Sequence, residues 1–337
     1  MKPALLWVVR RAVIAPAAVM LTTLLWVTLP AWVIVAALIS PVLPGRWRAL
    51  RLLWLVILYA TCEALLLLVL FGLWFSSGFG RRVRTPYFEG IHYDLVQGLM
   101  WVFFREARRV LALRIETDGP SPDAHPGVPI LVACRHAGPG DSFTLIHALM
   151  HWYHREPRVV LKDTLAWDPA IDVVLNRIPA RFVDPRGGDI EHLIEELAHG
   201  LDENDAFVIF PEGGNFTPAR RQRGIDRLRK LGLEKMATRA EAMTNVLAPR
   251  PGGFIAALDG APDADVVLVA HTGLDHMLTV GDVWRELPMD KRIIMRWWQV
   301  PRDEIPAGRD ERIEWLFGWW ERIDAWIEAN KPEDLAR

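Results

Sequence analysis

The chain has 337 residues, with 39 Lys and Arg, 41 Asp and Glu, and two cysteines. Because the charges nearly cancel, the composition argues against a nucleic-acid-binding protein that relies on a basic surface. Two cysteines exclude a disulfide framework and a cysteine-rich zinc module. The hydrophobic content of 51% and the 16 tryptophans exclude intrinsic disorder. The length corresponds to one large domain or two ordinary ones.

The apolar residues are concentrated near the N-terminus. Residues 12–40 form a run of 29 without charge, and residues 52–75 form a run of 24 with one charge, Glu63. A bilayer-spanning helix needs about 20 apolar residues, whereas the apolar core of a cleaved signal peptide has about 7–15. We therefore predict a two-helix membrane hairpin over residues 1–80. Glu63 and the prolines Pro16 and Pro30 leave both a full span and a shallow insertion into one leaflet open.

Basic residues flank the predicted hairpin. Three arginines lie between the two apolar runs, and a larger number of basic residues lies outside them, at Lys2, Arg10, Arg11, Arg81, Arg82 and Arg84. The positive-inside rule therefore predicts a protein of the cell membrane with its C-terminal part on the cytoplasmic face.

Residues 86–110 follow with the spacing of an amphipathic helix, closed by Arg105, Arg108 and Arg109. A helix of this kind lies either on the membrane surface or on the core of the domain. The sequence leaves both interpretations open.

Short apolar runs then alternate with helical patterns. Strands are predicted at 128–134, 158–161, 180–183, 206–210 and 265–270, and helices at 143–154, 190–200 and 224–245. This alternation predicts an α/β fold with a mixed, largely parallel sheet flanked by helices. Residues 301–337 form a separate predicted segment with an amphipathic, Trp-rich helix at 310–329, which packs on the domain or lies at a membrane interface.

The first candidate site is the segment 135–141, Arg-His-Ala-Gly-Pro-Gly-Asp, between a predicted strand and a predicted helix. A tight turn over its glycines and proline would fold Asp141 back on His136. A carboxylate on one imidazole nitrogen fixes the tautomer, so the other nitrogen can act as a general base. The alternative is that Asp141 merely caps the helix and that His136 is an incidental loop residue.

The second candidate site is the segment 210–217, Phe-Pro-Glu-Gly-Gly-Asn-Phe-Thr, which follows a predicted strand. Gly213 and Gly214 let backbone N–H groups approach an anion, and Arg220, Arg221 and Arg223 follow closely. The segment therefore predicts a site for a phosphate or for CoA. A plain turn beside a solvated basic face is the alternative.

Together these segments resemble a known family. Residues 128–142 (VPILVACRHAGPGDS) and 206–217 (AFVIFPEGGNFT) are similar to the first and third motifs of the lysophospholipid acyltransferases, which include the 1-acylglycerol-3-phosphate acyltransferases. Residues 162–169 resemble the Lys-x-x-Leu…Pro segment of the family, and residues 181–186 resemble its second motif. Residues 246–254 and 298–306 are nearest the lysocardiolipin acyltransferase branch.

The resemblance implies a fold and an activity. It implies a glycerolipid acyltransferase-like catalytic domain over residues 81–300. Acyl-CoA or acyl carrier protein would supply a fatty acyl group, and the free hydroxyl of a lysophospholipid in the bilayer would accept it. The default acceptor is 1-acyl-sn-glycerol-3-phosphate, and lysocardiolipin, lysophosphatidylinositol or a glycolipid are alternatives. No metal, other cofactor or nucleic acid is implied.

The resemblance also implies roles for individual residues. His136 would be the general base and Asp141 would orient it. The residues implied in substrate binding are Lys162, Arg186, Glu212, Gly213 and Gly214.

The sequence departs from the family pattern at four places. Arg135 stands where the family usually has Asn, and Gly138 or Pro139 stands where the first motif usually has Ser. The third motif lacks its usual Arg, and the strand at 266–270 lacks a Pro. These departures leave acyl transfer intact and leave the acceptor open.

Two other nucleophiles are possible. Gly140-Asp141-Ser142 resembles the nucleophile block of a lipase or esterase, for which Asp189 and His192 would be the partners, although the chain has no Gly-x-Ser-x-Gly. Cys134 with His136 is the other option, and a buried strand cysteine is the simpler interpretation.

A membrane scaffold without enzymatic activity is a further alternative. It would make the order of these motifs along the chain a coincidence.

Overall fold

The computed structural model describes residues 3–43, 45–119, 127–184, 187, 189–273, 275, 280–286 and 290–332. The chain divides into two compact units. The helical unit contains Met1–Leu113, Val160–Gly187 and Val283–Asp290. The sheet unit contains Arg114–Val159, Gly188–Asp282 and Lys291–Arg337. These units follow contacts rather than chain order, so the division into residues 1–80, 81–300 and 301–337 stays a prediction.

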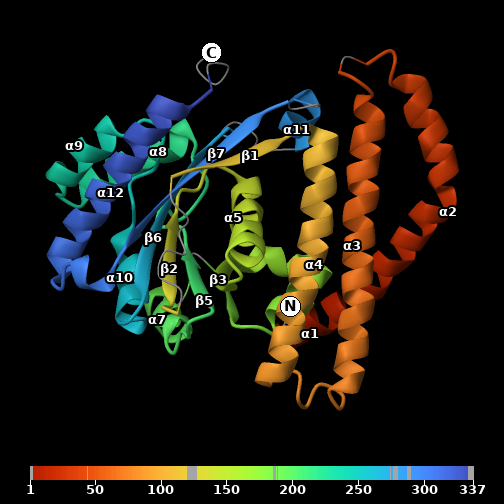
Figure 1. Ribbon diagram of the computed structural model, residues 1–337, viewed down its shortest axis with the longest axis horizontal. Coiled ribbons are helices and arrows are strands. Elements are labelled where there is room, and N and C mark those ends of the chain that lie inside the picture. The colour runs from red at the N-terminus through yellow and green to blue at the C-terminus, as the bar shows by residue number, and fades with distance from the viewer. Residues whose placement is uncertain are drawn as a thin grey trace. The chain divides into compact units, whose positions relative to one another are not determined.

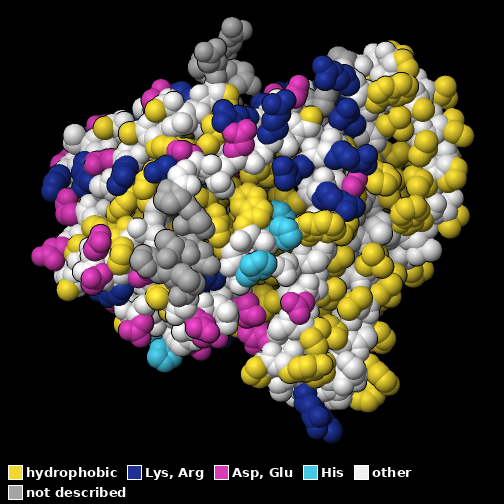
Figure 2. Space-filling model, in the orientation of Figure 1, with side chains coloured by type: hydrophobic (Ala, Val, Ile, Leu, Met, Phe, Trp, Pro, Cys, Tyr) yellow, Lys and Arg dark blue, Asp and Glu magenta, His cyan; other side chains and the backbone are white. Residues whose placement is uncertain are grey.

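The helical unit begins with long apolar helices. They are α1 (Pro3–Val9), the π-helical turn η1 (Arg10–Ile14), α2 (Ala15–Ile39) and α3 (Arg48–Ser76), followed by α4 (Pro86–Leu111). α3 packs against α2 on one side and α4 on the other (Figure 1). By length and composition, Leu5–Ile39 and Arg48–Ser76 could each cross a membrane. Hydrophobic side chains cover much of their outer surface (Figure 2).

A short segment from the middle of the chain packs on these helices. It contains the end of strand β3 (Glu156–Lys162), the 3-10 turn η2 (Asp163–Trp167), α6 (Pro169–Leu175) and β4 (Ala180–Val183). Val173 and Val174 of α6 pack against Leu67 and Leu70 of α3. Asp172, on the same short helix, is fully buried.

Two arginines of the N-terminal turn reach the Asp172 carboxylate. Arg10 Nη2 lies 3.2 Å from Oδ1, and Arg11 Nε lies 3.0 Å from Oδ2. Their side chains are 20% and 25% exposed, whereas that of Asp172 is 0% exposed. Because a buried charge without a partner is costly, this triad fixes α6 to the N-terminal helix.

A seven-stranded sheet has the order β1-β7-β6-β2-β5-β3-β4. The remaining strands are β1 (Arg114–Asp118), β2 (Ile130–Cys134), β5 (Asp205–Ile209), β6 (Asp265–Thr272) and β7 (Arg292–Val300). β2 pairs in parallel with both β5 and β6, and β3 pairs in parallel with β5. β6 and β7 pair antiparallel. The predicted fold class is therefore confirmed, with β1 and β7 added to the five predicted strands.

Helices flank the sheet. They are α5 (Pro139–Trp152), α7 (Ile190–Ala198), α8 (Pro218–Lys230), α9 (Glu234–Ala242), α10 (Pro251–Gly260) and α12 (Arg309–Asn330). Another helix, α11 (Val280–Glu286), belongs to the helical unit from Val283 onward. α10 contacts β2 and β5, α12 contacts β6, and α5 lies on the other face (Figure 1). The single helix predicted at 224–245 is wrong. Gly232 has a left-handed φ of 72° and separates α8 from α9.

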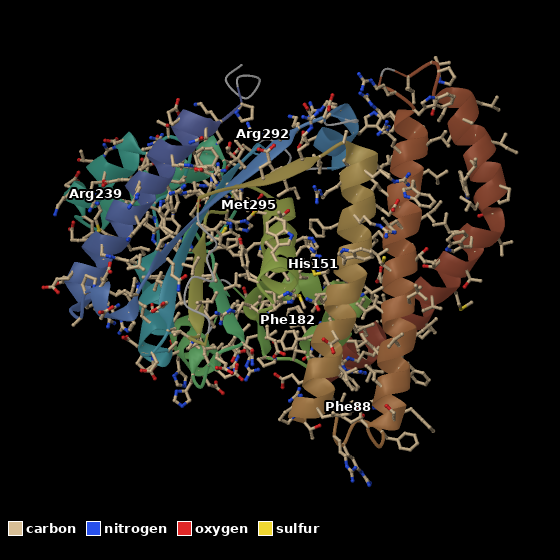
Figure 3. All side chains as sticks on the ribbon, viewed as in Figure 1. Phe88, His151, Phe182, Arg239, Arg292 and Met295 are labelled. Atoms are coloured by element: carbon tan, nitrogen blue, oxygen red, sulfur yellow. The ribbon has the colours of Figure 1, made fainter. Side chains whose placement is uncertain are left out.

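The C-terminal helix packs on the sheet unit, which is one of the two predicted interpretations. Leu316, Trp320 and Ile323 of α12 are each fully buried. Arg239 of α9, labelled in Figure 3, donates through Nη2 to Glu321 of α12 over 3.0 Å. The apolar face of α12 is therefore part of the core of this unit.

Candidate functional site

Three neighbouring strands of the sheet unit end at one edge. β6, β2 and β5 are parallel and adjacent, so their carboxyl ends lie together. The chain beyond β2 carries His136, the chain beyond β5 carries the segment 210–217, and His271 is the last residue but one of β6. In open α/β sheets this edge is where ligands bind. The two candidate segments of the sequence therefore meet in one place.

The segment 210–217 contacts the backbone N–H, the backbone carbonyl and the ring of His136. The His136 N–H donates to Glu212 Oε1 over 2.9 Å, and the His136 carbonyl accepts from the Phe216 N–H over 2.7 Å. The Phe210 ring lies against the imidazole, with centroids 4.5 Å apart. The backbone and the ring of His136 are thus positioned by the Phe-Pro-Glu-Gly segment rather than by its own turn alone.

Asp141 lies at the start of α5 and faces the imidazole, as the turn predicts. Its Oδ2 accepts the Gly138 N–H and lies 3.8 Å from His136 Nδ1. That distance is longer than a hydrogen bond of roughly 2.7–3.2 Å. However, His136 Nδ1 is buried and has no hydrogen-bond partner in the described part of the chain. Catalytic hydrogen bonds often tighten only when substrate binds, so Asp141 is the natural partner for this nitrogen.

Asp141 is almost fully buried yet remains ionised. Burial raises its pKa, but the neighbouring His271 and His136 and the Gly138 N–H outweigh that effect and hold the pKa below its ordinary value. An ionised carboxylate at this position favours a positive charge on the neighbouring imidazole.

His271 was not assigned to the site from the sequence. It is buried, and its Nε2 lies 3.6 Å from Asp141 Oδ2 and 3.2 Å from the Arg135 carbonyl. Asp141 therefore lies between two histidines. The available signal was the His-Thr-Gly-Leu-Asp segment after a strand, but its spacing gives no indication that β6 lies beside β2.

Arg135 explains one departure from the family pattern. Its guanidinium is buried, forms an ion pair with Asp275, and donates to the carbonyls of His271 and Asn245 over 2.8 and 2.9 Å. The arginine thus ties the ends of β2 and β6 together. An asparagine side chain would be too short to make all three contacts.

Glu212 joins two loops beneath His136. Its oxygens accept the N–H groups of His136 and Leu247, each over 2.9 Å, and its side chain is buried. Burial raises the pKa of Glu212 from 4.5 to about 7, although Arg135 and the two N–H groups oppose the shift. The structure shows a positioning contact, and the substrate-binding role of Glu212 stays a prediction.

Replacing Glu212 with Gln should lower the free energy of unfolding. It should also remove the part of the pH dependence of stability that Glu212 causes. Gln offers one acceptor, so one backbone N–H loses its partner at a cost of about 1–3 kcal/mol. Because the folded protein binds this proton more tightly, the contribution of Glu212 is complete below about pH 4.5 and is lost as the pH rises through about 7. Thermal inactivation midpoints between about pH 5 and pH 8 would show a fall in the wild type that the variant lacks. An equal slope in both proteins would contradict this assignment.

Because Gly213 and Gly214 have no Cβ, two arginine side chains can lie close to them. Gly213 has a left-handed φ of 67°, and a Cβ there would lie 3.1 Å from Arg250 Nη1. A Cβ on Gly214 would lie 3.2 Å from Arg220 Nη1. Burial together with the charges of Arg227 and Arg220 lowers the pKa of Arg250. Among the described residues none of these three arginines forms an ion pair.

The substrate-binding roles of two other residues stay predictions. Lys162 is exposed at the end of β3 and belongs to the helical unit, and Arg186 lies outside the described residues. Cys134 is fully buried, and burial raises the pKa of its thiol well above the ordinary value, which disfavours it as a nucleophile. Within the described ranges no group of three or more His, Cys, Asp and Glu could hold a metal.

Comparisons with known proteins show what the segment around this site is similar to. Residues 114–270 match the family model described as Acyltransferase. No curated protein matches the chain. Among solved structures, the crystal structure of the 1-acyl-sn-glycerophosphate acyltransferase from Thermotoga maritima is similar, with a TM-score of 0.48 and 13% identity, over 78% of this chain and 96% of that chain. The matched segment contains His136, Asp141 and the Phe-Pro-Glu-Gly segment, so the resemblance of this part of the chain to the acyltransferases is confirmed, and the lysocardiolipin acyltransferase branch stays a prediction.

Proposed function

We propose that this protein transfers a fatty acyl group from a thioester, acyl-CoA or acyl carrier protein, to the free hydroxyl of a lysophospholipid, by default 1-acyl-sn-glycerol-3-phosphate. The observation that carries the proposal is the buried, unpartnered Nδ1 of His136 facing the Asp141 carboxylate beside the Phe-Pro-Glu-Gly segment. The exposed apolar helices support a membrane location, where lysolipids and acyl chains partition. The cytoplasmic orientation is part of the proposal.

His136 acts as the general base. With Nδ1 directed to Asp141, Nε2 takes the proton from the acceptor hydroxyl as its oxygen attacks the thioester carbonyl. The C–S bond then breaks, and the imidazolium returns the proton to the leaving thiolate, which gives the free thiol and the ester. Asp141 stabilises the imidazolium between these steps. Backbone N–H groups at the start of α5 stabilise the oxyanion.

Arg250 and Arg220, which lie against Gly213 and Gly214, bind the acceptor phosphate. The third motif lacks the arginine usual in the resembled family, and Arg220 and Arg250 come to the same loop from α8 and from the start of α10. Arg guanidinium groups bind phosphate oxygens through two parallel hydrogen bonds. Since the arginines have no carboxylate partners in the described structure, a dianionic phosphate would neutralise them.

Acceptor-dependent release of free CoA tests the proposal. Purified protein in detergent would be supplied with palmitoyl-CoA and a panel of lysophospholipids, and the product identified by mass spectrometry. The proposal expects CoA release that requires an acceptor and survives Ser142→Ala. Release without acceptor that is lost in Ser142→Ala would instead establish a hydrolase. The structure argues against that outcome, because Asp189 caps α7 by accepting the His192 N–H over 3.1 Å.

Arg250→Gln should weaken binding of the phosphate-bearing acceptor. Loss of one guanidinium–phosphate contact costs about 1.5–3 kcal/mol, so KM for the acceptor should rise about 10- to 100-fold with a smaller change in kcat. Lys230→Gln, at an exposed position at the end of α8, is the matched control and should leave KM unchanged. An equal rise in KM for acceptors with and without phosphate would contradict this role.

A further inference from the structure

An open cavity of about 460 Å³ lies among α2, α3 and α4 of the helical unit. Its walls are mainly apolar, and Arg51 and Arg109 are among the residues that line it. The apolar lining residues include Leu29 and Val33 of α2 and Leu53 and Ile57 of α3. The cavity therefore combines an apolar wall with a positively charged part, which is the chemistry of an amphiphile with an anionic head.

The charged part belongs to a larger arginine cluster, which we define as Arg46, Arg48, Arg51, Arg105, Arg108 and Arg109. Arg51 brings its two halves together, because Nε donates to the Arg46 carbonyl over 2.8 Å and Nη1 donates to the Val110 carbonyl at the end of α4. Basic side chains gather on this part of the surface in Figure 2. The same two segments, residues 45–51 and 105–110, contain one carboxylate, Glu106.

Glu106 does not neutralise the cluster. It pairs with Arg109 Nη2 over 2.7 Å and with Arg105 Nε over 3.4 Å. Among the residues that the structure describes, Arg46, Arg51 and Arg108 form no ion pair. The Arg109 side chain is 69% exposed, so its guanidinium is accessible to a ligand from solvent or from a membrane surface. The cluster thus keeps an excess of positive charge beside an apolar cavity.

The geometry points to a bound anionic phospholipid, with its phosphate between Arg51 and Arg109 and an acyl chain along Leu29, Val33, Leu53 and Ile57. A free phosphate would use only the charged part and leave the apolar wall in water. A zwitterionic lipid would bring its own cation to the arginine cluster. Arginine binds phosphate well because its planar guanidinium matches two phosphate oxygens. Anionic headgroups are attracted to such basic clusters next to apolar helices.

Lipid binding to the full-length protein tests this site. The protein, washed free of native lipid in a neutral detergent, would be titrated with phosphatidylglycerol or phosphatidylcholine of identical acyl chains. Native mass spectrometry would count the bound lipid. We expect one tightly bound phosphatidylglycerol per chain, with phosphatidylcholine at least about tenfold weaker. Equal binding of the two lipids would overturn the proposal.

Variants distinguish lipid binding at a defined site from nonspecific attraction to basic residues. Arg51→Gln with Arg109→Gln should weaken phosphatidylglycerol at least about tenfold, whereas Arg81→Gln with Arg82→Gln, which removes two exposed arginines of the same unit, should have little effect. Equal losses from both pairs would show diffuse attraction and overturn the proposal. If Arg51→Gln disturbs folding through its contact with Val110, Arg109→Gln alone serves, because that side chain is exposed and its substitution leaves the Val110 contact in place.

Two further changes test the apolar wall and the local charge. Val33→Trp leaves every charge in place and fills the cavity, so it should weaken phosphatidylglycerol. Glu106→Gln removes the local carboxylate and should strengthen it. Normal binding in Val33→Trp, or displacement of the lipid by inorganic phosphate, would show an anion site without a lipid-binding cavity.

Discussion

His136→Ala is expected to lower kcat/KM for acyl transfer by about 10²- to 10⁴-fold, the usual contribution of a positioned general base. The imidazole is the group on which the proposed proton transfers depend. Its backbone is clamped to Glu212 and Phe216, so the loop keeps its conformation when the side chain is removed. The loss should therefore fall on kcat, with KM for the acceptor little changed.

The measurement is acceptor-dependent CoA release under single-turnover conditions. His192→Ala, an exposed histidine on α7 of the same unit, is the control and should keep the wild-type rate. Asp141→Asn should also reduce the rate, since an amide cannot stabilise the imidazolium. Full activity in His136→Ala would remove the proposed mechanism and direct attention to Ser142.

Removing both arginines that pair with Asp172 should destabilise the helical unit severely. In Arg10→Gln with Arg11→Gln, the Asp172 carboxylate would stay fully buried without a cation. Breaking a buried ion pair from one side costs about 3–5 kcal/mol. We expect the low end of that range, because both arginine side chains reach solvent in part. The midpoint of thermal aggregation in detergent would report the loss.

A double-mutant cycle separates the ion pairs from other effects. Asp172→Asn alone should be mildly destabilising, since the side chain also accepts from Asn176 Nδ2 over 3.2 Å. Adding Asp172→Asn to the arginine double variant should recover most of the lost stability, because the buried charge disappears. Additive losses would mean that the arginines stabilise the fold by packing alone.

The strands could be predicted from the sequence where their apolar residues form one clear pattern. β2 and β6 are buried along their whole length and read as continuous apolar runs. β7 was missed because Arg292 and Arg296 interrupt its apolar residues, although Ile293, Met295 and Trp297 alternate inward. β1, with the sequence RIETD, is a polar edge strand with no such signal.

The site could be predicted only where it is local in sequence. His136 and Asp141 are joined by one turn, so their spacing indicates their contact. His271 reaches Asp141 through the pairing of β6 with β2, and Arg250 reaches Gly213 from the start of α10. Contacts of this kind depend on strand order, which local patterns do not encode. The role of Arg135 could not be predicted for the same reason, because its partners come from β6 and beyond.

The orientation prediction has a similar weakness. It treated the arginines between the two apolar runs as one side and the rest as the other. The bond from Arg51 to the Val110 carbonyl places the end of α4, with Arg105, Arg108 and Arg109, beside the arginines that precede and begin α3. Arginine counts along the sequence therefore do not separate two sides, and the cytoplasmic orientation stays a prediction.

The division into units has a consequence for how this chain can be cut or inherited. The chain passes from one unit to the other after residues 113, 159, 187, 282 and 290. A protease that cleaves one connection leaves the units joined by the other four. The helical unit is equally out of reach of simple gene fusion or deletion, because no single breakpoint adds or removes it.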